Sequence, residues 1–374
     1  MTNKRDIINT IKLLIYQEVP EILEKISFKD ENIFLNPLLF SYFNSKKSGC
    51  FDKEILTEML QGYYLKKEKL NIKHSFNKEN IAYIPKVGYF RKGKKKAFMP
   101  IEIIKDTSIE IIKYTHPLFA NIFESTIKNK IDDNNFILDE QLFNKNIEYL
   151  TNAFKYIKVS SEEHFNLIEQ SCKKCILFKT NPENTNSFAT IKAHGMAFFN
   201  VYQKEYDEVF FVDDIAHQTG HIILNTILFE RKMYFLIDEN ENIAVITKIK
   251  SEYRSFYILF HALYTYYTTL TCIDNCIDSK CFKERQLHEA KARIGFYLNK
   301  VISDVYHFNQ FISFHNGIDF VLSDRGIEIY TTMEDKFVKM ISKWYHPITK
   351  NYDYSNQPYN FTYKEFIKLN PIQK

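Results

Sequence analysis

The stretch that organises this chain reads Asp213-Asp214-Ile215-Ala216-His217-Gln218-Thr219-Gly220-His221, and it runs on into the apolar residues Ile222-Ile223-Leu224. Its apolar residues recur at helical spacing, and Asp213 or Asp214 is a suitable N-cap for the helix. The preceding residues 208–212, Glu-Val-Phe-Phe-Val, predict a short strand or a buried run. Residues i and i+4 of a helix share one face, so His217 and His221 point at one spot. Neutral imidazoles at this spacing are typical of a divalent metal clamp.

This histidine pair differs by one residue from the His-Glu-x-x-His motif of zinc metalloproteases. In those enzymes the glutamate is the general base that acts on metal-bound water. The corresponding residue here is Gln218, and an amide cannot accept a proton at neutral pH. The motif therefore keeps its two metal ligands and lacks its hydrolytic base.

A third ligand is available in a second predicted helix, residues 252–272, which reads EYRSFYILFHALYTYYTTLTC. His261 lies in the middle of its broad apolar stripe. Arg254 precedes it by two turns on the same face, with Tyr257 between them. A cation and an imidazole on an apolar helix need a polar partner, and a metal with an anionic ligand would provide one. A buried histidine is also often structural and hydrogen-bonded, so this second interpretation stays open.

These two segments together resemble the HExxH-motif family of peptide-modification proteins, which occur beside ribosomally made peptide natural products. Members pair an HExxH helix with a downstream stretch of the form W-R-x-D-P-R-P-L-x-x-L-L-H-G-x-Y-A. Its two basic residues, its histidine and its tyrosine are matched here by Lys250, Arg254, His261 and Tyr264. Leu322-Ser323-Asp324-Arg325-Gly326 resembles the family's L-T-x-x-G turn before a last helix. The resemblance covers approximately residues 190–345.

Some members of that family are iron(II)- and 2-oxoglutarate-dependent hydroxylases that act on the side chains of peptides. The resemblance therefore implies that this protein hydroxylates an aliphatic C–H bond in a residue of a ribosomally synthesised precursor peptide. His217, His221 and His261 would bind Fe(II). Arg254, with Lys250 as the weaker candidate, would bind the distal carboxylate of 2-oxoglutarate through charge-assisted hydrogen bonds.

Several alternatives remain open from the residues alone. The common facial triad has two histidines and a carboxylate, so Glu252, Asp213 or Glu230 could replace His261 as the third ligand. Tyr257 and Tyr264 either line the pocket or pack in the core. Gln218 fits oxidation better than hydrolysis, because an oxygenase needs no protein base to activate water. A zinc-dependent peptide hydrolase with another base, and a non-catalytic peptide-binding partner, are the alternative functions.

Composition favours a globular, mainly α protein with small β elements. Of 374 residues, 45% are hydrophobic, and glycine and proline occur only nine times each, which favours long uninterrupted helices. A net charge of +4 does not indicate a nucleic-acid partner. We expect no membrane span, because no uninterrupted apolar stretch is long enough. The first 26 residues mix charges into an amphipathic helix and do not predict a signal peptide, so we expect a cytoplasmic protein.

The sequence divides at the linker-like residues 180–190. Residues 1–180 are expected to form a helical region with a possible hairpin within 81–105, turning near Gly93. Residues 190–346 would form the metal-binding catalytic region, a helical core in which an HxxxH helix meets a second ligand helix. Further helices are expected at 284–313 and 327–344, and an irregular tail at 347–374. Nothing in the sequence specifies the oligomeric state.

The cysteines are expected to be thiols in a reducing compartment. Cys172 and Cys175 form a CxxC motif, but a matching second pair is missing. Cys272, Cys276 and Cys281 do not have a standard zinc-binding spacing. We therefore interpret these residues as small apolar or surface side chains in preference to a second metal site.

Overall fold

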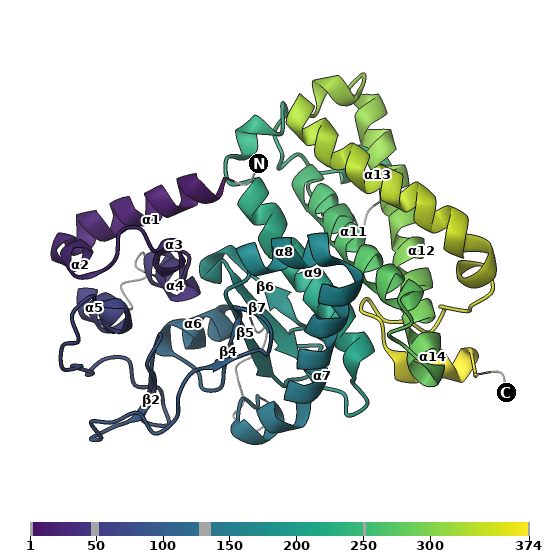
Figure 1. Cartoon of the computed structure of the whole chain (residues 1–374). Helices are drawn as coiled ribbons and strands as arrows, with labels where there is room; N and C mark the ends of the chain where they lie inside the picture. The colour runs from purple at the N-terminus through teal and green to yellow at the C-terminus, as the bar shows by residue number, and fades with distance from the viewer. Residues whose placement is uncertain (1–2, 46–51, 127–135, 250–251, 373–374) are drawn as a thin grey trace. The chain divides into compact units, whose positions relative to one another are not determined.

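The computed structural model describes residues 3–45, 52–126, 136–249 and 252–372, with the side chain of Ser125 left aside. It is 58% helix and 10% strand, which confirms the predicted mainly α class with small β elements (Figure 1). The protein forms two compact units, each made of segments distant in the sequence. Unit 1 is Met1–Thr151, Leu167–Tyr206 and Asn225–Ile227, and unit 2 is Asn152–Asn166, Asp207–Leu224 and Leu228–Lys374.

Unit 1 begins with helices that bury one apolar face. They are α1 (Lys4–Glu18), α2 (Pro20–Lys25), α3 (Glu31–Phe34), α4 (Pro37–Ser45) and α5 (Lys53–Leu60). The predicted stripe of α1 is confirmed, since Ile7, Ile11 and Ile15 are buried. The predicted break is also confirmed. Val19 has a φ of −148° and a ψ of 75°, because the ring of the following proline excludes the helical conformation.

The predicted hairpin of unit 1 is present, but its strands reverse earlier than expected. Strands β1 (Ile81–Ile84) and β2 (Gly88–Arg91) pair antiparallel, and the backbone turns between them at Lys86, whose φ is 64°. Gly93 forms a second turn beyond β2. Its φ is 79°, and the Lys94 amide donates to the Arg91 carbonyl at 2.9 Å. The expected turn near Gly93 therefore exists, although it does not join the two strands.

The main sheet of unit 1 has five strands in the order β3-β4-β5-β7-β6. These are β3 (Glu102–Ile103), β4 (Glu110–Ile112), β5 (Lys174–Phe178), β6 (Phe188–Ala189) and β7 (Met196–Asn200). β4, β5 and β7 are mutually parallel, and all residues of these three strands are buried, as is usual for parallel strands. Helices α6 (Pro117–Thr126), α7 (Glu140–Ser160) and α8 (Glu162–Ser171) lie between these strands in the sequence.

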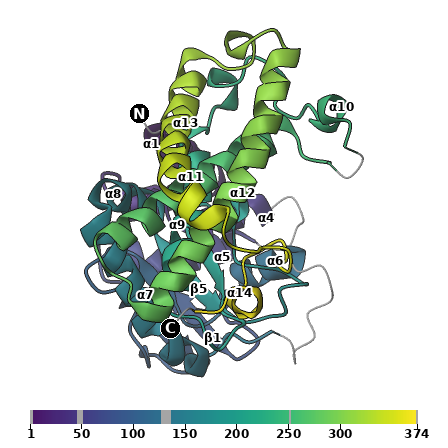
Figure 2. The same ribbon diagram turned by 90° about the vertical axis from the view of Figure 1, so that its right-hand side faces the viewer.

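Unit 2 is built on long helices: α9 (Glu208–Ile227, its last three residues belonging to unit 1), α11 (Phe256–Asp278), α12 (Glu284–Phe314) and α13 (Asp324–Trp344). α11, α12 and α13 run side by side (Figures 1 and 2). Shorter helices are α10 (Ala244–Thr247) and α14 (Tyr363–Leu369). The prediction of an irregular tail was wrong at α14. Phe366 of this helix is fully buried against the rings of Phe361 and Tyr354, so tertiary packing orders it.

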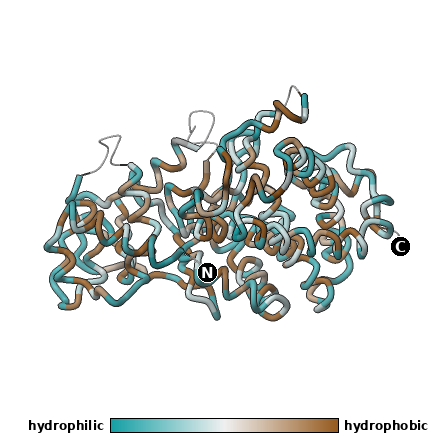
Figure 3. The backbone as a smooth tube through the Cα atoms, turned by 90° about the horizontal axis from the view of Figure 1, so that it is seen from above, coloured by the Kyte–Doolittle hydropathy of each residue, from teal (hydrophilic) through white to brown (hydrophobic). Residues whose placement is uncertain are grey.

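The helices of unit 2 are amphipathic. In α13 the buried residues Tyr330, Met333, Phe337, Met340 and Trp344 recur at helical spacing, with polar residues between them. Hydrophobic and hydrophilic residues accordingly alternate along the backbone (Figure 3). Within the described parts of the protein, none of the helices combines the length and the apolar character that a membrane span requires.

α9 and α11 approach each other most closely at Gly220. Thr268 Oγ1 donates to the Ala216 carbonyl at 2.9 Å, and a Cβ on Gly220 would lie 2.5 Å from that same oxygen. Thr265 Cα would be 3.5 Å away. Only glycine therefore permits this contact without displacing α11.

We expect Gly220→Ala to lower the free energy of unfolding by about 1–3 kcal/mol, because it overpacks this helix contact. Urea denaturation measures the loss. The double variant Gly220→Ala/Thr268→Ala removes the clashing oxygen and should be more stable than Gly220→Ala alone. A Gly220→Ala variant as stable as the original protein would contradict the contact.

Candidate metal centre

The helix that carries the histidine pair begins earlier than the sequence predicted. The N-cap of α9 is Asp207, whose carboxylate accepts from the Val209 amide at 3.0 Å, and neither Asp213 nor Asp214 caps it. Residues 208–212, predicted as a strand or buried run, form the first turns of the helix. Aromatic and β-branched residues have only a small intrinsic penalty in a helix, and burial of this run outweighs it.

The structure brings His217, His221 and His261 together. His221 Nδ1 lies 2.7 Å from His261 Nε2, and the rings of His217 and His221 have centroids 5.0 Å apart. On its other side, His261 Nδ1 lies 3.0 Å from the Tyr257 hydroxyl. Two of these imidazoles come from α9 and the third comes from α11. The helical spacing used to interpret the sequence therefore identified side chains that are neighbours in space.

All three imidazoles are held in their neutral form. Burial lowers the pKa of His217 to about 3 and the pKa of His221 to about 3. Burial is also the main reason that the pKa of His261 falls well below its ordinary value, and the neighbouring His221 adds to the effect. A neutral imidazole has a free lone pair on one nitrogen, which is the form that binds a metal.

A divalent metal fits the chemistry of this cluster, although the rings are not yet arranged around one. Imidazole nitrogens bind zinc at about 2.0–2.1 Å, which separates two adjacent ligand atoms by about 3 Å. The 2.7 Å between His221 Nδ1 and His261 Nε2 is close to this separation. Across the described residues, however, no group of three or more His, Cys, Asp or Glu side chains is positioned to hold a metal.

His217 is the ring that would have to turn toward the other two. Its Nδ1 atom is buried and makes no hydrogen bond to any described residue. A buried polar atom without a partner is energetically costly, and a ligand that engages this ring would remove part of that cost. The ring of Tyr297 lies beside it, with centroids 6.2 Å apart.

Gln218, which replaces the glutamate of the HExxH motif, is buried within α9. Its Nε2 donates to Asp214 Oδ1 at 3.0 Å, one turn back along the helix. Its Oε1 is buried and finds no hydrogen-bond partner within the described ranges. The amide therefore has a fixed donor contact and an acceptor oxygen left over, and it supplies no base.

The structure does not leave Arg254 available for 2-oxoglutarate. Its guanidinium donates to Glu252 at 2.7 Å and to Asp304 at 2.8 Å, in a bidentate contact with each carboxylate. These contacts raise the pKa of Arg254 above its ordinary value. A co-substrate carboxylate would have to displace one of them. Lys250, the weaker candidate, lies outside the described residues.

The carboxylates proposed as alternative third ligands are engaged elsewhere or exposed. Glu252 is bound to Arg254, and its pKa is lowered by hydrogen bonds from that residue, which outweigh the opposing effect of burial. Asp213 accepts from Arg293 at 2.6 Å and from the Tyr297 hydroxyl at 2.8 Å. Glu230 is exposed beside a short 3₁₀ turn. His261 is thus better placed than these carboxylates to complete the site.

Two tyrosines were predicted to line the pocket, and the structure separates them. Tyr257 contacts His261 directly, and its ring also stacks under the Arg231 guanidinium at 3.8 Å. Tyr264 is buried, and its ring packs on Tyr267, with centroids 5.7 Å apart. Burial raises the pKa of Tyr264, as expected for a residue of the core. The polar contact to the histidines therefore comes from Tyr257.

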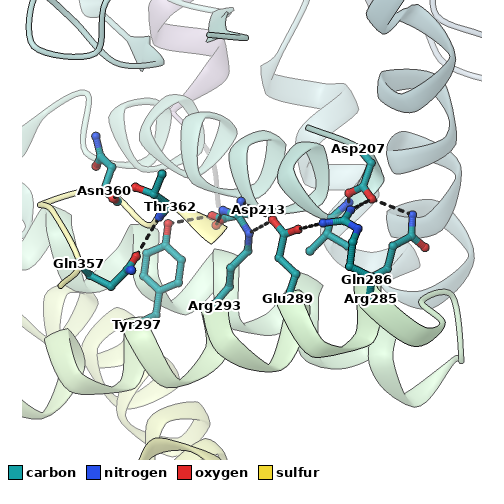
Figure 4. Close-up of polar contacts among 11 residues, drawn as sticks. Asp207, Asp213, Arg285, Gln286, Glu289, Arg293, Tyr297, Gln357, Asn360 and Thr362 are labelled. Atoms are coloured by element: carbon teal, nitrogen blue, oxygen red, sulfur yellow. Dashed lines mark hydrogen bonds and ion pairs between the residues drawn. The ribbon is translucent and has the colours of Figure 1, made fainter. Parts of the chain in front are cut away.

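Sequence reasoning missed a buried polar network between α9 and α12 (Figure 4). Asp213 and Glu289 both bind the guanidinium of Arg293, at 2.6 and 2.8 Å, and Tyr297 donates to Asp213. This network holds α9 one turn before His217. The signal was present in the sequence, because Glu289, Arg293 and Tyr297 stand at i, i+4 and i+8 on an otherwise apolar helix face.

A second residue that sequence reasoning missed is Lys300, one turn after Tyr297 on α12. Its ammonium donates to the Tyr359 carbonyl at 2.7 Å, and it forms no ion pair within 4.0 Å among the residues that the structure describes. Burial lowers its pKa to about 8, against the opposing effects of Asp304 and Asp213. Its charge also helps to lower the pKa of His217, so it lies within electrostatic reach of the histidines.

The remaining sequence candidates lie outside this cluster. Cys172 and Cys175 are fully buried, and burial raises the pKa of Cys172 to about 12 and that of Cys175 further. Such thiols are inert. His194 lies in unit 1, where its Nε2 is 3.0 Å from Thr226 Oγ1. Comparison with known protein families finds none that matches this sequence, and no curated protein matches it either.

Proposed function

We propose that this protein is an iron(II)- and 2-oxoglutarate-dependent oxygenase that hydroxylates an aliphatic C–H bond in a residue of a ribosomally synthesised precursor peptide. His217, His221 and His261 would hold the metal. The observation that carries the proposal is the contact between His221 and His261, from two helices, at a separation of 2.7 Å between their nitrogen atoms. Bound iron with 2-oxoglutarate and oxygen supplies the C–H oxidation.

The protonation states of the three histidines support metal binding. Their lowered pKa values leave them neutral, so no proton competes with the metal at neutral pH. Tyr257 sets which nitrogen of His261 carries its proton. When His261 Nδ1–H donates to the Tyr257 oxygen, the lone pair remains on Nε2, which faces His221. An outer hydrogen bond of this kind commonly orients a metal-bound histidine.

Gln218 supports oxidation over hydrolysis. A zinc peptidase needs a base to take a proton from water, and an amide cannot do this. The Gln218 oxygen lacks a partner among the described residues, and it can accept a hydrogen bond from a substrate amide N–H. In this role the residue orients the peptide and takes no part in proton transfer.

Lys300 is the cation that we assign to the distal carboxylate of 2-oxoglutarate, in place of Arg254. Arg254 is bound by two carboxylates, whereas Lys300 donates to one carbonyl and has no described ion pair. The aromatic rings of Phe296 and Tyr359 lie 4.6 and 4.3 Å from its ammonium and restrict access of water. A partly desolvated lysine gains strongly from an anionic ligand.

We expect Lys300→Met to raise the Kd for 2-oxoglutarate by at least about tenfold, through loss of a charge-assisted hydrogen bond. Lys291→Met, on the same helix, is the matched control and should bind like the original protein. Because the pKa of Lys300 is lowered to about 8, its ammonium is charged below that pH. Affinity should therefore be constant below pH 8 and fall by about tenfold per pH unit above it. Calorimetry with Fe(II) present measures both effects. Loss of binding in Arg254→Lys but not in Lys300→Met would return the role to Arg254.

The activity can be tested before the peptide is known. Oxygenases of this type convert some 2-oxoglutarate to succinate without substrate, so the purified protein is incubated with Fe(II), 2-oxoglutarate and oxygen, and succinate is quantified. Succinate in wild type and its absence in His217→Ala support the proposal. Bound zinc with peptide cleavage would support a hydrolase instead. A folded protein without metal or turnover would support a non-catalytic peptide-binding partner.

A further inference from the structure

The end of α11 places two cysteines against each other. The helix ends at Asp278, and Lys280 follows in the left-handed conformation with a φ of 56°. The Cys281 amide donates to the Cys276 carbonyl at 2.9 Å, and the Lys280 amide donates to the Ile277 carbonyl at 2.9 Å. This pair of bonds defines a Schellman motif, in which the side chains at the positions of Cys276 and Cys281 meet.

The two thiols differ in their surroundings. Cys276 is fully buried, and its sulfur lies 3.1 Å from Ser160 Oγ. Cys281 is half-buried and therefore reachable from solvent. A hydrogen bond from the Cys276 thiol stabilises the Cys281 thiolate and lowers the pKa of Cys281 to about 7, while the pKa of Cys276 is raised. The exposed sulfur is thus the more reactive one, and the buried sulfur lies next to it.

We propose that Cys276 and Cys281 are an oxidisable dithiol that reacts with hydrogen peroxide to form a reversible disulfide. The Cys281 thiolate attacks one peroxide oxygen. An S–O bond forms, the O–O bond breaks, and the leaving hydroxide takes up a proton to become water. The Cys276 sulfur then attacks the resulting sulfenic acid. The S–S bond forms, the S–O bond breaks, and water leaves with the proton of Cys276. Two thiols are oxidised by two electrons, and the peroxide is reduced to two waters.

The other described cysteines lack this combination of features. Cys172, Cys175 and Cys272 are fully buried, and burial raises the pKa of each above its ordinary value. Cys272 lies one helical turn before Cys276 and offers a matched control. The dithiol is independent of the metal centre, because it rests on the geometry of a helix end.

The test treats the full-length reduced protein with one equivalent of hydrogen peroxide, blocks the remaining thiols by alkylation, and maps disulfides by mass spectrometry. We expect a Cys276–Cys281 disulfide that dithiothreitol reverses, in the original protein and in Cys272→Ser. Cys276→Ser should stop at a sulfenic acid on Cys281 that dimedone traps. Before oxidation, an alkylating agent should modify Cys281 at least about tenfold faster than Cys272.

Three results would overturn the proposal. They are a disulfide between other cysteines, no disulfide in the original protein, and tight zinc binding that protects Cys272, Cys276 and Cys281 together. Mapping of the original protein requires no variant, so the proposal can be rejected even if a serine substitution prevents folding.

Discussion

His261→Ala is expected to abolish stoichiometric metal binding, with a rise of at least about 100-fold in the Kd for Fe(II). Removal of an outer contact alone typically weakens metal binding by about 10–100-fold, and loss of a ligand should cost more. His221 and His217 would remain on one face of α9, but the nitrogen 2.7 Å from His221 Nδ1 would be gone. Elemental analysis after anaerobic loading measures the effect.

Tyr257→Phe is the matched control for this prediction. It keeps His261 and removes only the hydroxyl 3.0 Å from its Nδ1. We expect this variant to retain one equivalent of iron, with a Kd raised by about 10–100-fold. If His261→Ala binds iron as tightly as the original protein, His261 is structural and the third ligand lies elsewhere.

The second large effect is expected for Arg293→Met, which should lower the free energy of unfolding by about 3–5 kcal/mol. The side chains of Arg293, Asp213 and Glu289 are 4%, 5% and 3% exposed. Removal of the guanidinium leaves two buried carboxylates without their cation, which costs more than the loss of an exposed pair. Asp213 lies one turn before His217, so the helix that carries the histidines loses its attachment to α12.

Arg285→Met is the control on the same helix. Arg285 also contacts Glu289 and Asp207, but its side chain is 37% exposed, so solvent screens both pairs. We expect its loss to cost about 0–1 kcal/mol in urea denaturation. Equal losses in the two variants would show that burial of the Arg293 network does not determine its contribution.

The elements that could be predicted from the sequence are those with a strong helical period. The proximity of His217, His221 and His261 follows from two amphipathic helices whose polar residues face one another. α1, α11, α12 and α13 were predicted for the same reason. The start of α9 was not, because residues 208–212 carry β-branched and aromatic residues whose weak preference for strands yields to burial.

Interactions between distant segments were beyond the sequence pattern. The parallel strands β4, β5 and β7 have three to five residues each, too few for a distinctive period. Arg254 had the expected spacing from His261, but its pairing with Asp304, 50 residues later, could not be predicted from that spacing. The cation that remains available, Lys300, belongs to α12, a helix that the family resemblance did not connect with the site.

The most direct test of the proposed oxygenase is an anaerobic titration of the purified protein with Fe(II) and 2-oxoglutarate, followed by visible absorption. Iron that is bound by the protein and chelated by 2-oxoglutarate produces a metal-to-ligand charge-transfer band. We expect this band in the original protein and in Lys291→Met, and its loss in His261→Ala. Absence of the band in the original protein, together with tight binding of zinc, would contradict the oxygenase and favour a hydrolytic or structural metal site.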